Sequence, residues 1–429
     1  MFLWTHRGLG LPIVMQGVWR TDSVVDPGEL EQLCVRVACG PLGRRVRRPR
    51  IPGARPEFVA NSRYYPLSVR SEPIAADAVV EWADDAALVS VDPERGPGWR
   101  IAATYDSSGG TVVSVTCSHV LADARGLIGA LRDAMQHKPS PPSDHTGRSD
   151  IADALSTVGR VLRGTSRAVG GLIVSPARRA ELRGFTTPAA PRRSARQTVT
   201  TAILEVDRVQ WDDAAASSGG TPNSLFLACV GELARAENKT AAVTLSVPMN
   251  VRTTGQSDNS VGSDNSVGSD NSVGSDNSVD NAVAMVAIPL TPSTTLAQIR
   301  RLCRDAFEAP PMSSPAGFPA ELLQVVPDRV AHRLADGPGQ RDALCSNIGT
   351  VDIDQFEGHR TSGLALRAVH PGASAAQLDS TSTRVSGYLS RNNATYTLSL
   401  VSFESADNQA LRTLACNTLE KFGISARSW

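Results

Sequence analysis

Two side chains that follow an apolar segment have the types and spacing of an acid–base site. His119 comes directly after the segment 111–118, and Asp123 lies four residues later. The reference pKa of an imidazole is about 6.5, so at neutral pH the ring is mostly neutral and can accept a proton. Aspartate is also a preferred N-cap, and a helical pattern starts just after Asp123. The pair is therefore interpreted as a base with its support or, more plainly, as a packed histidine beside a helix cap.

The pattern His-x-x-x-Asp occurs a second time, at His332 and Asp336. The second copy lies inside a helical pattern over 322–334, and Asp336-Gly337 has the composition of a helix end. A histidine at a helix end is expected to be structural. We select His119 because it ends a strand pattern, where a side chain can face a cleft.

Several elements must position these residues. The segment 111–117 is rich in β-branched residues and follows the turn 106–110, which predicts a strand. The segment 79–105 is consistent with short strands or with a helix followed by a strand. Strands and helices interleave along the whole chain, which favours an α/β or α+β class. We expect strands at 198–206, 242–247, 282–290 and 396–403, and helices at 26–38, 127–135, 151–172, 209–216, 221–234 and 408–422.

Changes in composition divide the chain into three parts. Its 429 residues suit two domains, which we place at 1–136 and 197–429. The Arg-rich segment 137–196 between them is expected to be a crossover helix packed on the protein, and contact with an anionic membrane is the alternative. The hexad Ser-Asp-Asn-Ser-Val-Gly, repeated over 257–279, predicts an expanded surface loop. A calcium site there is disfavoured because the EF-hand spacing is missing.

Composition excludes several functions. The net charge is zero, so no global field attracts nucleic acid. The seven cysteines form no CxxC pair and are interpreted as buried thiols in a reducing compartment, with no zinc site. No apolar segment reaches the roughly 18 residues of a membrane span, so we expect a cytoplasmic protein. The basic run 44–50 is interpreted as a solvated turn, and contact with CoA phosphates or an acidic carrier protein is the alternative.

Five segments occur in an order that a known superfamily shares. They are 18–44, Ser118 to Asp123, 221–234, Ser246 to Arg252, and Cys345-Ser-Asn-Ile-Gly349. The chain resembles the superfamily of condensation domains and HxxxD acyltransferases. Within it, the chain is most similar to actinobacterial wax ester synthase-like and polyketide-associated acyltransferases.

The resemblance implies a fold and a set of roles. The fold would be two chloramphenicol-acetyltransferase-like halves, each an α+β two-layer sandwich, in a V with the active site at their interface. His119 would deprotonate the acceptor, and Asp123 would be structural, bonded to an Arg of the second half, for which Arg252 is the candidate. Gly126 would support the site. From position alone, Ser346 or Asn347 would stabilise the oxyanion.

The implied activity is transfer of an acyl group to a hydroxyl acceptor in lipid, glycolipid or natural-product biosynthesis. The donor would be acyl-CoA or a phosphopantetheine thioester on an acyl carrier protein, with no permanently bound cofactor and no metal, and the protein would be a monomer. Two departures bear on this. Ser118 replaces the first histidine of the paired motif, and Ala124 replaces the glycine after the aspartate, narrowing the cleft if that glycine keeps it open. The alternatives are a free-standing amide-forming condensation enzyme and a catalytically silent binding protein.

Overall fold

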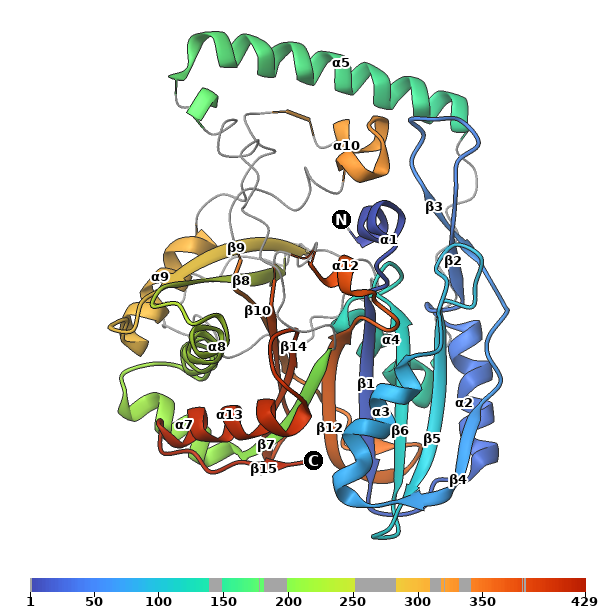
Figure 1. Ribbon diagram of the computed structural model, residues 1–429. Coiled ribbons are helices and arrows are strands. Elements are labelled where there is room, and N and C mark those ends of the chain that lie inside the picture. Colours follow the sequence, from blue (N-terminus) through green and yellow to red (C-terminus); the bar gives the residue numbers. More distant parts are fainter. Residues whose placement is uncertain are drawn as a thin grey trace, which may run out of the picture.

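The computed structural model describes residues 2–138, 149–176, 178–180, 199–250, 283–308, 318–319, 321–331, 341–379, 381 and 383–429. Two β-sheets lie side by side, and helices cover them on their outer faces (Figure 1). We call the six-stranded sheet, with order β11-β12-β1-β6-β5-β4, the first sheet, and the seven-stranded sheet, with order β15-β7-β14-β13-β10-β8-β9, the second sheet. This arrangement agrees with the expected mixed α/β class.

The first sheet has buried central strands. Strand β6 lies between β1 and β5, and all eight of its residues are buried. The strand predicted at 111–117 is thus confirmed. The strands are β1 (Val14–Thr21), β4 (Ser68–Ile74), β5 (Trp99–Asp106), β6 (Thr111–Ser118), β11 (Gln355–Phe356) and β12 (His359–Val369). A separate two-stranded ribbon pairs β2 (Arg44–Arg47) with β3 (Glu57–Ala60).

Helices around the first sheet begin where local signals predict. The Asp26 side chain accepts a hydrogen bond from the Gly28 N–H at the start of α2, and Gly40 follows its last residue. Apolar side chains of α2 and α4 pack together with the first sheet in one core. The segment 79–105 is a helix followed by a strand, which resolves that alternative. The helices are α1 (Phe2–Leu9), α2 (Pro27–Cys39), η1 (Ala76–Ala78), α3 (Val79–Ala87) and α4 (Ala124–Met135).

The second sheet is covered mainly by α8, whose Thr221 and Ser224 form a reciprocal cap. Helices α7, α8, α9 and α13 bury one continuous core against this sheet. The strands are β7 (Thr200–Asp207), β8 (Val243–Asn250), β9 (Val283–Leu290), β10 (Ala343–Thr350), β13 (Val385–Arg391), β14 (Thr395–Ser402) and β15 (Arg427–Ser428), and the helices are α7 (Arg208–Ser217), α8 (Pro222–Asn238), α9 (Leu296–Glu308), α12 (Ala375–Asp379) and α13 (Asn408–Glu420).

Strand β12 connects the two halves. It belongs to the first sheet, where it pairs with β1, although its sequence lies within 197–429. Its Arg367 is fully buried and donates to Gln16 and to Asp84, and Asp84 also accepts from Thr201 of β7. The division at 136 and 197 therefore does not follow the sheets at this strand. Pairing between residues 350 positions apart leaves no local mark in the sequence.

A long crossover helix and a short one complete the fold. Helix α5 (Asp150–Val174) confirms the helix predicted at 151–172 and runs along the outer edge of the molecule (Figure 1). Helix α10 covers only Leu322–Val325 of the helix predicted over 322–334, because Pro327 interrupts the pattern before a further turn at 328–331. His332, Asp336 and the repeats of 257–279 lie outside the described residues.

Candidate active site

His119 lies in the turn that immediately follows β6. Its backbone N–H donates to the carbonyl of Ile13, one residue before β1, at 2.9 Å. The side chain is partly exposed, whereas the strand before it is fully buried. Two central strands therefore fix the backbone of His119 at the end of β6, and its side chain is only partly buried.

Asp123 is the N-cap of α4. Its Oδ1 accepts a hydrogen bond from the Gly126 N–H at 2.8 Å, and the side chain is 7% exposed. The next residue, Ala124, is the first residue of α4 and is also buried. The helix cap expected from the sequence is thus present: His119 and Asp123 lie in the turn between β6 and α4, and Gly126 lies in the first turn of α4.

Replacing Asp123 should destabilise the protein. We expect Asp123→Ala to lower the free energy of unfolding by about 1 kcal/mol because the Gly126 N–H loses its partner. Asp123→Asn is the matched control, since its side-chain oxygen can still accept that hydrogen bond. Thermal unfolding measures both variants. An Asp123→Ala protein that melts at the wild-type temperature would contradict the capping role.

Arg44 anchors the turn that carries His119. It is 1% exposed, and its guanidinium donates to the carbonyl of Leu121 at 2.7 Å and stacks 3.8 Å above the Phe58 ring. A Cβ on Gly43 would lie 1.9 Å from the carbonyl oxygen of Ala38, so only glycine lets the chain enter β2 here. This role of Arg44 was not predicted from the sequence, although Arg44 ends the segment 18–44, which carries part of the resemblance.

The basic run 44–50 was expected to be a solvated turn, and this expectation is wrong. Its first four residues form β2, Arg44 is buried, and two other arginines pair with acids: Arg47 with Glu57 and Asp150, and Arg48 with Glu94. Burial alone would raise the pKa of Glu94, but hydrogen bonds from Arg48 and Arg7 outweigh it and bring the pKa to about 2. These acidic partners neutralise much of the positive charge that contact of this run with CoA phosphates would need.

A cavity of about 650 Å³ lies beside the histidine turn. Val120 and Phe2 line it, together with parts of the β2–β3 ribbon and residues near α10. The Phe2 ring stacks on the His119 imidazole, with centroids 3.6 Å apart and planes 17° from parallel. The stacking covers one face of the imidazole, but the lone pair of a ring nitrogen lies in the ring plane. Nδ1 is itself buried, which leaves Nε2 as the ring nitrogen to be considered for contact with a proton donor.

A second histidine, His370, lies next to this group. It follows β12, and its ring contacts Phe403, just after β14, edge-on at 5.5 Å between centroids. Burial lowers the pKa of His370 to about 4; a hydrogen bond with the backbone of Pro12 opposes the shift, and nearby His119 adds to it. His370 is thus neutral at neutral pH but a weak base. His119, His370 and Phe403 thus form a cluster that extends from the first sheet to the end of β14 in the second sheet.

His370 should make the protein less stable in acid. Below pH 6.5 the unfolded chain protonates this side chain, whereas the folded chain does so only near pH 4, so stability falls as the pH drops between these values. This linkage would cost at most about 2 kcal/mol between pH 7 and pH 5. We expect His370→Gln to lose correspondingly less stability over this range in urea unfolding. Equal losses in variant and wild type would argue against the lowered pKa.

Ser346 and Asn347 lie on β10 of the second sheet. The Asn347 amide donates to Asn223 at the start of α8, and its oxygen accepts from the Gly349 N–H. Gly349 has a φ of +84°, which explains the glycine of the Ser-Asn-x-x-Gly segment. The Asn347 side chain is thus engaged in holding a bulge of β10, and Ser346 is half-buried on the same strand. Arg252 lies outside the residues that the structure describes.

The cysteines do not offer a nucleophile beside the histidine. Cys117 is buried in β6, two residues before His119, and burial raises the pKa of its thiol to about 12. Five of the seven cysteines are buried as expected, whereas Cys39 is exposed and Cys416 is half-buried. Because burial disfavours the thiolate, Cys117 does not have the environment of an activated nucleophile.

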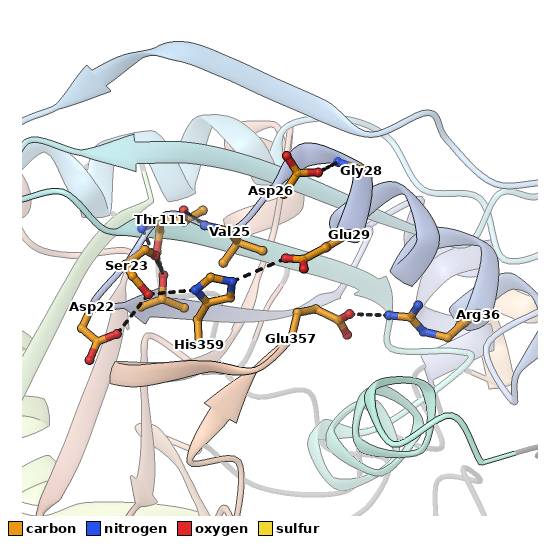
Figure 2. A network of polar contacts seen from close by, with 11 residues as sticks. Asp22, Ser23, Val25, Asp26, Gly28, Glu29, Arg36, Thr111, Glu357 and His359 are labelled. Carbon is orange, nitrogen blue, oxygen red and sulfur yellow. Dashed lines mark hydrogen bonds and ion pairs between the residues drawn. The ribbon is translucent and has the colours of Figure 1, made fainter.

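A third histidine has a serine and a glutamate as partners. The Ser23 hydroxyl lies 2.8 Å from His359 Nδ1, and Glu29 lies 3.4 Å from Nε2 (Figure 2). The order of contacts is that of a hydrolase triad, but Ser23 is exposed and the Glu29 side chain is 47% exposed, whereas a triad needs a buried, orienting acid. We interpret the group, with the Arg36–Glu357 pair, as the attachment of β12 to α2.

In the described ranges, no three His, Cys, Asp or Glu side chains gather closely enough to bind a metal ion. Among the helices of the same ranges, none combines the length and the apolar character needed to cross a membrane.

Comparison with protein-family models and with curated proteins finds no match. Solved structures do match. The first condensation domain of the CDA synthetase aligns with a TM-score of 0.60 at 13% identity, over 98% of this chain and 93% of that domain. The condensation domain of the Monacolin K polyketide synthase MokA gives 0.54 at 11% identity, over 98% and 93%. SgcC5 from Streptomyces globisporus gives 0.53 at 13% identity, over 95% and 91%.

These likenesses extend over almost the whole chain and almost the whole of each matched chain. The chain therefore has the fold of the condensation domains, with two chloramphenicol-acetyltransferase-like halves. This confirms the fold that the ordered segments of the sequence imply.

Proposed function

We propose that this chain, which has the condensation-domain fold, is an acyltransferase that moves an acyl group from a thioester to a hydroxyl acceptor with His119 as general base. The observation that carries the proposal is the position of His119. It is partly exposed at the end of a buried strand, in a turn that also lines the cavity through Val120. A general base needs a fixed backbone and a ring nitrogen that the acceptor can contact, and the proposal gives this role to Nε2 because Nδ1 is buried.

The chemistry needs no covalent enzyme intermediate. A ring nitrogen of His119 takes the proton of the acceptor hydroxyl, and the oxygen attacks the thioester carbonyl carbon. The carbonyl oxygen becomes an oxyanion, for which the Ser346 hydroxyl or a backbone N–H is the proposed donor. When the carbon–sulfur bond breaks, the imidazolium returns its proton to the thiolate, so that an ester and a free thiol leave.

The cavity is the proposed approach for one substrate. Its volume of about 650 Å³ is in the range of small-molecule sites. Apolar side chains such as Phe2, Ile51 and Phe58 line it, and Arg7, Arg50 and Asp328 bring charge to it. This mixture suits a long arm with an apolar acyl chain and a charged end, such as an acyl chain on a phosphopantetheine thioester.

A hydroxyl acceptor is favoured over an amine by two observations. Ser118 replaces the first histidine of the paired motif, as in many ester-forming relatives by resemblance. The structural neighbour SgcC5 is described in complex with (R)-(-)-1-(2-naphthyl)-1,2-ethanediol and sucrose, and the first of these is a diol. A free-standing amide-forming enzyme is the second candidate. It is supported by another structural neighbour, a nonribosomal peptide synthetase that aligns with a TM-score of 0.54. This chain covers 42% of that synthetase chain.

A thiol-release assay tests the function. Purified full-length protein is incubated with acyl-CoA or acyl-pantetheine donors and with a hydroxyl or an amine acceptor of matched structure, and free thiol and product mass are measured. The proposal predicts thiol release that requires the hydroxyl acceptor and one ester for each thiol. Amide formation alone would favour the second candidate. Release that is independent of any acceptor would indicate a thioesterase and would contradict both.

A further inference from the structure

Large apolar side chains gather on an outward face of α5. Fifteen such side chains are exposed in the described part of the chain, and seven of them belong to this one helix. Their exposed fractions run from 41% to 83%. Such a concentration on one element marks a contact surface, because isolated exposed apolar residues are otherwise scattered. The seven are Ile151, Leu155, Val158, Leu162, Val169, Ile173 and Val174.

The exposed residues form a continuous line along the helix. From Ile151 to Ile173 they follow one another at steps of four, three, four, seven and four residues, so six of the seven share one helical face. We call these six the outer stripe. A second line, formed by Ala154, Thr157, Val161 and Ala168, is buried against the protein. The two lines adjoin on the helix, so only part of its apolar face is used for the crossover role expected from the sequence, and the outer stripe stays exposed.

The exposed charge on the polar side of α5 is positive. Arg163, Arg167, Arg178 and Arg179 are exposed on α5 or in the residues just after it. Its only two acids, Asp150 and Asp153, lie in the first turn, where they pair with Arg47 and Arg55 of the protein body. Arg160 pairs with Glu321, so the charge that remains exposed along the helix is that of Arg163 and Arg167. Figure 1 shows the helix at the outer edge of the molecule, where a large flat partner can reach it.

We propose that the outer stripe of α5 docks on the surface of an anionic lipid bilayer. An amphipathic helix with exposed Leu, Ile and Val on one face and arginines beside it lies in the interface of such a membrane, with the apolar face towards the acyl chains and the cations near the lipid phosphates. Pairing with a second copy of the chain is less favourable, because it would bring two rows of arginines together. Gly159 and Gly170 have no neighbour within 4 Å of a Cβ position, which leaves this side of the helix open.

The proposal is independent of the chemistry at His119. Vesicle binding uses α5 alone, so His119→Ala should bind vesicles as the wild type does, whatever its activity. Conversely, a water-soluble acyl donor and acceptor should be converted at the same rate with or without vesicles. Failure of one proposal can therefore be distinguished from failure of the other.

Co-sedimentation of the full-length protein with vesicles tests the proposal. Vesicles of phosphatidylcholine are compared with vesicles that contain phosphatidylglycerol, at low salt and at high salt. We expect binding to the anionic vesicles that high salt weakens. The double variant Leu155→Gln/Leu162→Gln should reduce the partition coefficient by about tenfold or more, and Arg163→Gln/Arg167→Gln should reduce it by roughly tenfold or more on anionic vesicles only.

The matched control replaces equally exposed apolar residues elsewhere. Leu88 and Val209 are 60% and 64% exposed, so Leu88→Gln/Val209→Gln removes similar side chains without touching α5 and should bind as the wild type does. Hydrogen exchange on the wild type adds a test that needs no variant, because vesicles should protect amides of 150–174. The proposal would be overturned if the wild-type protein binds neither kind of vesicle. It would also be overturned if the protein is a dimer without lipid and Leu155→Gln/Leu162→Gln dissociates that dimer.

Discussion

His119→Ala should lower kcat/KM for acyl transfer by about 10²- to 10⁴-fold while the protein stays folded, because the acceptor hydroxyl loses its proton acceptor. The ring is partly exposed, and the backbone of residue 119 is held by Ile13 rather than by the side chain. The loss should therefore appear in kcat/KM for the acceptor and leave the thermal transition close to that of the wild type.

His359→Ala is the matched control for this substitution. His359 is the first residue of β12, at the end of the first sheet opposite to His119, and its partners Ser23 and Glu29 are exposed. We expect His359→Ala to change activity by less than about twofold, since no reacting atom lies near it in this account. Transfer by His119→Ala at the wild-type rate, or equal losses in the two variants, would reject the role of His119.

Arg44→Ala should produce the second large effect. The arginine is buried, and its substitution leaves the Leu121 carbonyl without this donor and opens space beside Phe58. We expect the free energy of unfolding to fall by about 2–4 kcal/mol. Because the same turn carries His119, activity measured on the folded fraction should also drop, by about tenfold or more.

Arg70→Ala on β4 is the control for stability. Its side chain is 54% exposed and pairs with an exposed Glu72 at 3.7 Å, so its removal should cost less than about 1 kcal/mol. Urea unfolding monitored by circular dichroism compares the two variants. If Arg44→Ala is no less stable than Arg70→Ala, the anchoring of the histidine turn by Arg44 is wrong.

Local signals in the sequence predict the elements around the site. The helix at 26–38 is correct because Asp26-Pro27 and Gly40 mark its ends, and the strand at 111–117 is correct because its β-branched residues need a buried sheet. The cap at Asp123 follows from its side chain alone. Each of these features depends on residues fewer than about 15 positions apart, which is the range over which local pattern carries structural information.

Long-range pairing could not be predicted in the same way. Strand β1 contains Gln16, Gly17 and Arg20, which break any apolar alternation, yet Gln16 is buried because Ala83, Ser114 and Arg367 satisfy it. Arg44 was interpreted as part of a solvated run for a similar reason. A buried polar residue is recognisable only from partners distant in sequence. The same limit explains why 137–196 was expected to pack on the protein, whereas one line of apolar residues on α5 is exposed.

The pH dependence of kcat/KM tests the central claim most directly. We expect transfer by the wild type to rise with pH through one ionisation, and we expect this ionisation to be absent from the residual activity of His119→Ala. A wild-type profile without such an ionisation, or the same profile in His119→Ala, would contradict the account.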